Sequence, residues 1–533
     1  MTEPQDTAAA MDDVRALRAL TAVTLNALAD GAAARGGPLP AGGPDTVAAR
    51  TRELCAPVLP EVGIGGRDAL YDMVRAAAQG AADPSDPHCV AHLHCPPLAL
   101  AAAADLAASA LNPSMDSWDQ APASAVIEEE VTRALSALTY PGHPAPDALI
   151  TSGGTESNLV ALLLARERAQ ARGAGPLRVL AGTNAHHSVG RACWLLGLPA
   201  PLPVACTGGR IDPGAVDRRL AALDGAPALL VATAGTTDEG LIDPLPELAA
   251  VVERYGAELH VDAAYGGPLL FSETLAPQLR GIERAVSITW DLHKLGWQPV
   301  AAGLIAVADG RTLEALSLRA EYLNADDDTE AGLPDLLGRS LRTSRRPDVL
   351  KIATTLRALG RSGVAGLVEH CVDTARRFAD LVDAHPALRR PPGGVGISTV
   401  LFRPTAADGM PDEEGDALVA EIRRRLLTDG RAVLGRARTT DGDGVPRLWL
   451  KATLLHPRTT AEDLCPLLKL VTEQAARIVE DSAERVPASR RPADTPPAHP
   501  EGPAAGAAPP ASCRPAGAHA GHADPGGAAP SSP

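Results

Sequence analysis

The middle of the chain alternates short apolar runs with helix-like or turn-rich segments. Between residues 145 and 310 the apolar runs are DALI, LRVLAG, ALLVATAG, ELHVDAA, AVSIT and AGLIAV. These runs lack the every-second-residue alternation of a half-exposed strand. Short buried strands separated by helices are typical of a mostly parallel sheet that is covered on both faces. The pattern therefore predicts an α/β domain.

The segments on either side of this region are patterned differently. In the stretch 12–23 (DDVRALRALTAV), two acidic residues precede apolar positions at helical spacing, which predicts a helix with one buried face. Asp45 and Asp68 are expected to mark two further helix starts. After Leu336 a long helical stretch, RPDVLKIATTLRALGRSG, leads into a second mixed segment with strand candidates at ISTVLF and RLWLKATLL.

The last fifty residues differ in composition. From Pro487 onward the chain contains no Leu, Ile, Val, Phe, Tyr or Trp, so this part cannot bury enough apolar surface to offset its ordering entropy. We therefore predict four regions: an N-terminal helical segment (1–85), a large α/β domain (86–375), a small C-terminal α+β domain (376–483) and a disordered tail (484–533).

Charge and hydropathy narrow the class of function. The 533 residues carry a net charge of −16, and nothing concentrates basic charge, which argues against a nucleic-acid partner. No apolar run approaches the roughly 20 residues that span a bilayer, so no membrane partner is expected. The first residues also lack the basic segment and apolar core of a secretory signal. These features predict a cytoplasmic protein of enzyme size.

Five of the predicted strands run into small, polar or ionisable residues. Ligands of open α/β sheets bind at the carboxyl ends of the strands, and five such ends are hard to attribute to packing alone. A ligand site is therefore predicted at this edge of the sheet. The five strand-end sequences are TSGGTESN, TNAHHSVG, TAGTTDEG, DAAYGG and WDLHK.

The sequence TSGGTESN precedes a predicted helix, LVALLLARERAQ. Backbone N–H groups and the helix dipole at a turn containing Gly153 and Gly154 would suit an anion, phosphate above all. The alternative is an ordinary turn in which Thr155 or Ser157 caps the helix, because short glycine-rich matches are weak evidence by themselves.

Asp262 directly follows an apolar strand. Its carboxylate is either a buried structural acceptor or the partner of a cation in a cleft, such as a metal or a protonated ring nitrogen. The adjacent Ala263 and Ala264 leave room for a flat group. Metal is the weaker alternative, because His260 and Asp262 are expected to lie on opposite faces of the strand and so not to form a joint ligand pair.

Lysine is rare in this chain, yet one lysine lies in the sequence SITWDLHKLGW. Lys294 follows an apolar strand and has Trp290 and Trp297 near it, so it would be partly desolvated and nucleophilic. The alternative, a surface lysine with a buried stem, explains none of the other strand ends. A phosphate turn, an acid for a ring nitrogen, an imidazole to stack and an amine for a Schiff base are what pyridoxal phosphate requires. The four lysines are Lys294, Lys351, Lys451 and Lys469.

With these motifs, the sequence resembles the group II pyridoxal-phosphate-dependent amino acid decarboxylases. Similar motifs run from about His92 to Lys451 in the family's order. The resemblance implies an aspartate-aminotransferase-like α/β fold (fold type I), with a mostly parallel seven-stranded sheet, helices on both faces and a small C-terminal α+β domain. It also implies pyridoxal 5′-phosphate as cofactor, an amino acid as substrate, no metal, and a homodimer with the N-terminal helices wrapped on the partner.

The resemblance implies roles for individual residues. Lys294 would hold the cofactor covalently, Asp262 would keep its ring nitrogen protonated, and His186 would stack on the ring; these are the predicted catalytic residues. The other predicted cofactor-binding residues are Gly153, Gly154 and Thr155 of the phosphate turn, Ala264 against the ring, His293 at the phosphate, and Thr236 and Asp291 lining the pocket. His187 follows His186 at a position where the family varies.

Two N-terminal stretches, AHLHCPP and NPSMDSWDQAPASAVIEEEV, resemble the family's substrate-side motifs. The form SMDSWDQ is most similar to the branch that decarboxylates L-2,4-diaminobutyrate and lysine. The two stretches make His94 (in AHLHCPP) and Asp116 and Asp119 (in SMDSWDQ) the candidate substrate residues. The two aspartates would receive a distal ammonium; alternatively, they cap a helix. An aromatic or glutamate substrate, an aminotransferase or lyase reaction on the same fold, and a non-catalytic binding protein remain alternatives.

The proton donor to the substrate carbon is left open. Aromatic and glutamate decarboxylases have a mobile loop with a tyrosine that is thought to reprotonate this carbon. The corresponding stretch here, LNADDDTEAGLPDLLGRSLRTSRR, has no tyrosine, and Tyr322 lies at its base. His186 is the remaining candidate.

Overall fold

The computed structural model describes residues 14–173, 175–317, 327 and 330–485. By internal contacts the chain divides into Met1–Ala483 and Glu484–Pro533, and each unit is considered by itself. The helix start expected at residues 12–13, Tyr322 and the predicted disordered tail beyond residue 485 lie outside the described residues. The boundaries predicted at 85/86 and 375/376 stay predictions.

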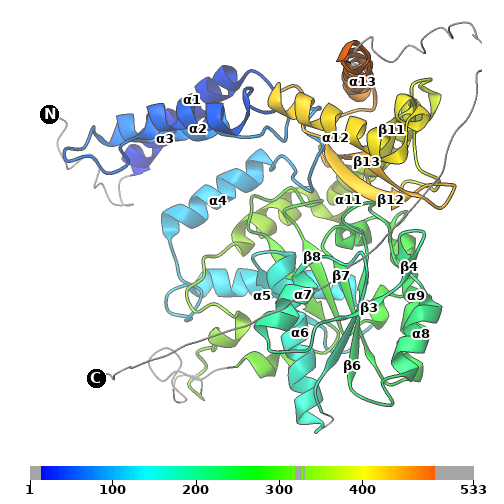
Figure 1. The fold of residues 1–533 in the computed structure, drawn as a ribbon. Coiled ribbons are helices and arrows are strands. Elements are labelled where there is room, and N and C mark those ends of the chain that lie inside the picture. Colours follow the sequence, from blue (N-terminus) through cyan, green and yellow to red (C-terminus); the bar gives the residue numbers. More distant parts are fainter. Residues whose placement is uncertain (1–13, 174, 318–326, 328–329, 486–533) are drawn as a thin grey trace, which may run out of the picture. The chain divides into compact units, whose positions relative to one another are not determined.

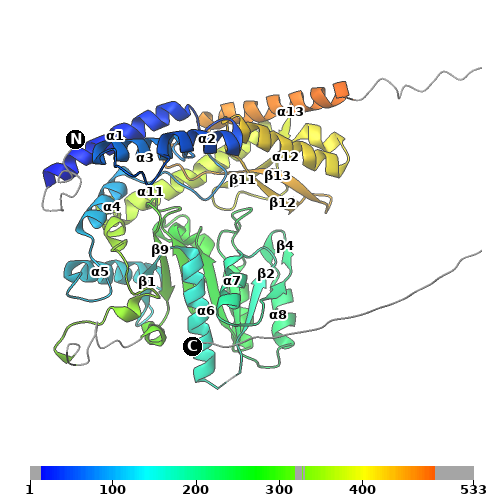
Figure 2. The same ribbon diagram turned by 60° about the vertical axis from the view of Figure 1, so that its left-hand side comes forward.

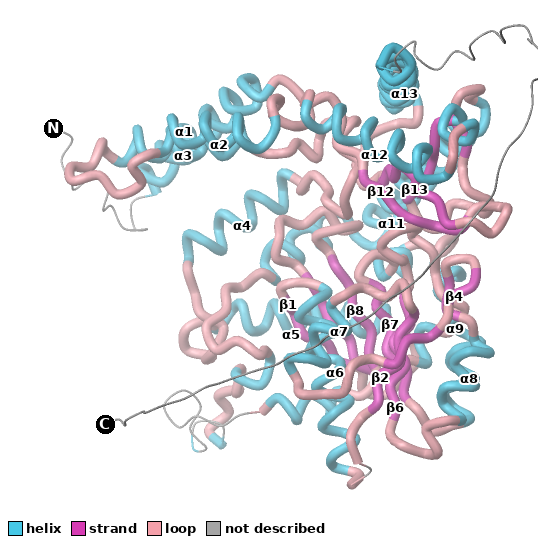
Figure 3. Tube along the Cα trace, viewed as in Figure 1, coloured by secondary structure: helices cyan, strands magenta, loops and turns pink. Residues whose placement is uncertain are grey.

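A seven-stranded sheet forms the centre of the large domain (Figures 1 and 3), with the order β1-β9-β8-β7-β6-β2-β3. Only β9 runs against its neighbours, so the predicted mostly parallel seven-stranded sheet is confirmed. Six of these strands are the predicted apolar runs; β3 was missed because it has three residues, one of them proline. The strands are β1 (Asp147–Thr151), β2 (Arg178–Gly182), β3 (Leu202–Val204), β6 (Ala228–Thr233), β7 (Glu258–Ala263), β8 (Ser287–Asp291) and β9 (Gly303–Val307).

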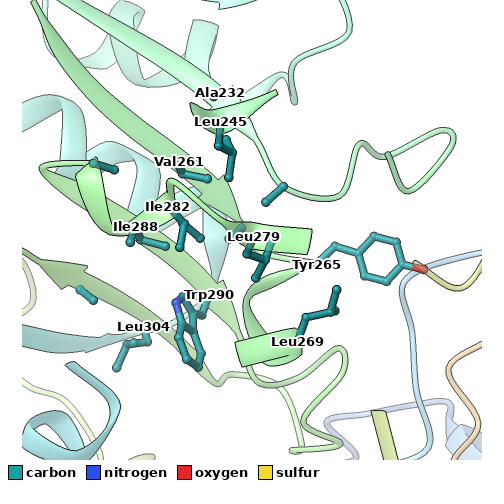
Figure 4. Close-up of a cluster of buried hydrophobic side chains, with 14 of the residues drawn as sticks. Ala232, Leu245, Val261, Tyr265, Leu269, Leu279, Ile282, Ile288, Trp290 and Leu304 are labelled. Atoms are coloured by element: carbon teal, nitrogen blue, oxygen red, sulfur yellow. The ribbon is translucent and has the colours of Figure 1, made fainter. Parts of the chain in front are cut away.

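Helices cover both faces of this sheet, as the unalternated apolar runs predicted. In β9, Leu304 and Ala306 belong to one buried cluster, whereas Ile305 and Val307 belong to another. Figure 4 shows part of the first cluster, with Trp290 and Leu304 among its side chains. The helices of the first cluster are α5 (Pro122–Thr139), α8 (Pro213–Ala221), α9 (Leu245–Arg254) and α11 (Val349–Ala384), and those of the second are α6 (Gly154–Ala171) and α7 (Ser188–Leu195).

A four-stranded antiparallel sheet follows α11, with the order β10-β11-β13-β12. Side chains of α12 and α13 pack on it in a separate apolar cluster, which confirms the predicted small α+β part. The two strands predicted in this segment, ISTVLF and RLWLKATLL, correspond to β11 and β13. The elements are β10 (Leu388–Arg389), β11 (Thr399–Pro404), α12 (Asp412–Thr428), β12 (Gly435–Thr440), β13 (Pro446–Thr453) and α13 (Cys465–Arg485).

The N-terminal part consists of helices, as predicted. Asp45 and Asp68 lie in the first turns of α2 and α3, and α3 packs beside both α1 and α2 (Figure 2). Among the described residues, no helix has both the length and the apolar character needed to cross a bilayer. These helices are α1 (Val14–Arg35), α2 (Gly43–Cys55), α3 (Gly66–Gly80) and, after residue 85, α4 (Ala99–Leu111). A short hairpin in the large domain is formed by β4 (Cys206–Thr207) and β5 (Arg210–Ile211).

Candidate active site

The five polar strand ends meet at one pocket of about 310 Å³. This volume lies in the range of small-molecule sites, about 300–1,000 Å³. The sheet brings the strand ends together because β1, β2, β6, β7 and β8 all run in the same direction. The lining residues include Gly153, Gly154 and Thr155 after β1, His186 after β2, Thr233, Gly235 and Thr237 at the end of β6, Asp262 and Ala264 at the end of β7, and Asp291, His293 and Lys294 at the end of β8.

The pocket floor at the start of α6 is made of glycine. Gly153 is the N-cap residue, and no described side chain caps this helix end. A Cβ atom on Gly153 would lie 2.9 Å from Cε1 of His293, and one on Gly154 would lie 3.1 Å from Cβ of Ala264. Only glycine therefore leaves this space open in front of free backbone N–H groups.

The alternative of a side-chain cap at this turn is wrong. Thr155 lies inside the first helical turn and is exposed. Ser157 is buried, and its hydroxyl lies 2.7 Å from Oγ1 of Thr151. The helix end is thus left available to a ligand, because neither hydroxyl occupies it.

Lys294 forms an ion pair inside the pocket. Its Nζ lies 2.9 Å from Oδ2 of Asp291, and its side chain is 18% exposed. The other carboxylate oxygen, Oδ1 of Asp291, is buried without a hydrogen-bond partner among the described residues. Because buried carboxylate oxygens are normally satisfied, this oxygen indicates that a donor group is missing from the pocket.

The surroundings of Lys294 differ from the apolar setting that the tryptophans suggested. Trp290 and Trp297 are buried; Trp290 packs against Phe271, and Nε1 of Trp297 donates to the carbonyl of Leu455. The sequence did not reveal that the direct partner of Lys294 is a carboxylate.

Asp262 is a buried carboxylate with two N–H donors. Its Oδ2 accepts from Nδ2 of Asn158 at 2.7 Å, and its Oδ1 accepts from the backbone N–H of Ala264 at 3.1 Å. Charge on this side chain is thus supported by two hydrogen bonds at the pocket wall.

The expectation that His260 and Asp262 lie on opposite faces of their strand is wrong. Residues two apart on a strand share a face, and both side chains contact Asn158. Within the described part of the chain, no group of three or more His, Cys, Asp or Glu residues could hold a metal ion.

His186 is half-buried beside these charges. Burial lowers the pKa of His186 from its usual value, while the nearby Asp262 carboxylate acts in the opposite direction. Its Nδ1 lies 2.8 Å from the hydroxyl of Ser188. The ring of the exposed His187 lies 4.1 Å from that of His186, centroid to centroid, but His187 does not line the pocket.

Four of the predicted site residues do not line the pocket of this chain. Thr236 is buried, and its hydroxyl accepts the N–H of Leu241, whereas its neighbours Gly235 and Thr237 face the pocket. His94 is exposed. Asp116 accepts a hydrogen bond from Gln120, and Asp119 accepts one from Ser117. The structure therefore does not bring the candidate substrate residues to the cofactor residues within one chain.

The sequence analysis missed Asn158 and Tyr265. Asn158 is fully buried and lines the pocket behind Asp262. Tyr265 also lines it, and its hydroxyl forms a hydrogen bond with the hydroxyl of Ser398, which directly precedes β11. Asn158 could have been noticed because it is a polar residue on the apolar face of the helix that contains LVALLLARERAQ. Nothing comparable in the sequence marked Tyr265.

Comparison with known proteins points to one family of enzymes. The family model described as "Pyridoxal-dependent decarboxylase conserved domain" matches residues 65–404. The L-2,4-diaminobutyrate decarboxylase of Rhizobium meliloti (strain 1021) is 39% identical over 431 residues, which cover 79% of this chain and 84% of that protein. The L-2,4-diaminobutyrate decarboxylase of Acinetobacter baumannii is 32% identical over 446 residues, which cover 78% of this chain and 85% of that protein.

A solved structure agrees in fold. It is the glutamate decarboxylase domain of the diaminobutyrate-pyruvate transaminase and L-2,4-diaminobutyrate decarboxylase from Vibrio parahaemolyticus. It has a TM-score of 0.74 and 29% identity to this chain, and the match covers 87% of this chain and 96% of that one. The α/β fold with a seven-stranded sheet and a smaller antiparallel sheet is therefore that of a known decarboxylase.

The pocket residues fit pyridoxal 5′-phosphate. The helix end with two glycines and no side-chain cap suits a phosphate. The amine of Lys294 is available for covalent attachment, and Oδ1 of Asp291 can accept a hydrogen bond from the cofactor. The buried carboxylate of Asp262 suits a protonated ring nitrogen. The chain therefore belongs to the pyridoxal-dependent decarboxylase family and is an amino acid decarboxylase whose cofactor is pyridoxal 5′-phosphate.

Proposed function

We propose that this chain decarboxylates a basic diamino acid, with L-2,4-diaminobutyrate as the first candidate and lysine as the second. The observation that carries this proposal is the 39% identity, along 79% of the chain, to the L-2,4-diaminobutyrate decarboxylase of Rhizobium meliloti. The resemblance of SMDSWDQ to the diaminobutyrate and lysine branch supports it. Because Asp116 and Asp119 do not line the pocket of their own chain, a role for them in binding the distal ammonium requires a second subunit.

Each pocket residue has a proposed task. Pyridoxal phosphate, when bound, supplies an electron-withdrawing ring that accepts the electrons released as the substrate loses CO2. Lys294 would hold the cofactor covalently after leaving Asp291. Gly153, Gly154 and His293 would hold its phosphate at the N-terminus of α6. Thr155 and Ala264 line the same pocket, so we keep Thr155 as a contact of the phosphate and Ala264 as a contact of the ring. Thr236 is given no contact with the cofactor.

Two further residues would tune the reaction. Asp262 is held by two N–H donors, so its charge can stabilise a proton on the ring nitrogen. His186 would stack on the cofactor. It is also the proposed proton donor to the substrate carbon, because its ring lies in the pocket beside Asp262 and Lys294.

A substrate panel tests the proposal. The purified holoenzyme is given L-2,4-diaminobutyrate, lysine, ornithine, glutamate and an aromatic amino acid, and CO2 release is measured together with the product. We expect kcat/KM for L-2,4-diaminobutyrate to exceed that for glutamate by roughly 100-fold, since a site built for a charged group rejects the opposite charge. A preference for glutamate would refute the substrate assignment, and a keto acid product would refute decarboxylation.

We further propose that the protein is a homodimer whose N-terminal segment contacts the partner subunit. The connection between α2 and α3 exposes large apolar side chains: Val58 is 77%, Leu59 93% and Val62 82% exposed. Patches of this kind are typical of association surfaces. Light scattering after size exclusion should give twice 54.7 kDa, and the double variant Leu59→Asp/Val62→Asp should shift the mass toward one copy. A fully active wild-type monomer would contradict the proposal.

A further inference from the structure

Asn158 lies at the centre of a buried hydrogen-bond network behind the pocket. Its Nδ2 lies 2.7 Å from Oδ2 of Asp262 and 2.9 Å from Oγ of Ser188. Its Oδ1 lies 3.0 Å from Nε2 of His260 and 2.9 Å from Oγ1 of Thr289. An amide offers two N–H donors and two oxygen lone pairs, so Asn158, which is 0% exposed, uses its whole hydrogen-bonding capacity.

The partners fix which way the amide points. An ionised carboxylate can only accept, so the NH2 group must face Asp262, and the amide oxygen is left to His260 and Thr289. Burial lowers the pKa of His260 to about 4, so this ring is neutral near pH 7. Its Nε2 faces the amide oxygen, and its Nδ1 lies 2.8 Å from the hydroxyl and 3.0 Å from the backbone carbonyl oxygen of Ser287.

The second branch of the network reaches His186. Because the oxygen of Ser188 accepts from Asn158, its own proton can be donated to Nδ1 of His186, 2.8 Å away. The backbone N–H of Ser188 points to the same nitrogen at 3.3 Å. Nδ1 of His186 is therefore an acceptor, and the proton of the neutral ring lies on Nε2.

We propose that Asn158 is a positioning residue for the decarboxylation, which fixes the carboxylate of Asp262 and the orientation and tautomer of His186 through one amide group. The proposal rests on the proposed function only where it takes Asp262 and His186 as the residues that face the cofactor. Loss of this single amide should then disturb both Asp262 and His186, although Asn158 itself is neither an acid nor a base.

The network is tested by nuclear magnetic resonance on the full-length chain, with and without cofactor, labelled with 15N-histidine. The signal of His186 is identified by its loss in His186→Gln. In the wild type we expect the proton on Nε2 and a titration midpoint below the usual value for histidine. In Ser188→Ala the hydroxyl donor to Nδ1 is gone and only the longer backbone N–H contact at 3.3 Å remains. The neutral form thus loses a hydrogen bond, so the pKa of His186 should rise and the second tautomer should become more populated.

Asn158→Ala should produce the same change at His186 and also affect the holoenzyme. We expect kcat to fall by about 10–100-fold, the scale seen when a residue that orients a metal ligand is lost, while KM changes less than about threefold. Thr374→Ala is the control, because it deletes a buried hydroxyl as Ser188→Ala does, and that hydroxyl donates to the carbonyl of Thr459 and contacts no member of the network. Neither the His186 titration nor kcat should change in this control.

An unchanged His186 titration in Asn158→Ala, or an unchanged kcat, overturns the proposal. If Asn158→Ala does not fold, Ser188→Ala decides, because an unaltered titration there removes the branch to His186. The proposed function fails separately: full activity without Lys294 would refute it, whereas the titration shifts would still establish the network.

Discussion

Replacing Lys294 by alanine is expected to remove the visible absorbance of lysine-bound cofactor and to lower kcat by roughly 10³-fold or more, the scale seen when a covalent catalytic group is deleted. The reason is that the amine is the only lysine nitrogen lining the described pocket, so no other side chain can take over the attachment. Absorbance spectra of the purified protein and CO2 release measure the two effects.

Two other lysine variants separate the possible causes. Lys294→Arg keeps a cation beside Asp291 but lacks a nucleophilic amine, so it should be as inactive as Lys294→Ala. Lys469→Ala removes a lysine that is 78% exposed and should change neither spectrum nor rate. If Lys294→Ala kept both the absorbance and the turnover, the central assignment of this pocket would be lost.

Replacing Asp262 by alanine is expected to lower kcat by about 10²–10³-fold, as the loss of one preorganised electrostatic group does in other active sites. Affinity for the cofactor should fall far less. The charge of Asp262 favours the protonated ring, which accepts electrons better, whereas phosphate binding and covalent attachment depend on other residues. Steady-state kinetics and a cofactor-binding titration on the same preparation compare the two losses.

Asp262→Asn is the matched variant because it keeps the size of the side chain, removes its charge and replaces one of the two acceptor oxygens by an NH2 group. We expect its kcat to be almost as low as that of Asp262→Ala. Near-normal turnover in either variant would contradict the role of Asp262, and a cofactor affinity that fell as steeply as kcat would assign Asp262 to binding instead.

Much of the fold could be predicted from local pattern. The apolar runs correspond to β1, β2, β6, β7, β8 and β9, because strands covered on both faces need apolar side chains at every position. Leu202–Val204 is too short to give such a run, and its place at the sheet edge depends on pairing with β2. The reversed direction of β9 also has no local signal, because pairing direction is set by the connections.

The candidate site could be predicted only in part. Residues such as Lys294, His186 and Asp262 stand out because they are ionisable and directly follow apolar strands. The ion pair of Lys294 with Asp291 and the contact of Asn158 with Asp262 do not stand out, because they depend on side-chain direction. The error over His260 has a different origin: residues two apart on a strand share a face, so strand periodicity alone already places His260 and Asp262 on the same side.

By itself, the sequence determined that this protein has a doubly covered α/β sheet with polar groups at its strand ends, and its motifs pointed to the family and the cofactor. Only the tertiary structure decided which of these groups share a pocket, that Thr236, His94, Asp116 and Asp119 lie outside its lining within one chain, and that Asn158 joins Asp262 to His186. The physical reason is that chain periodicity specifies which residues are buried. The hydrogen bonds of Asn158, by contrast, join residues up to 131 positions apart and form only after helix and sheet have packed.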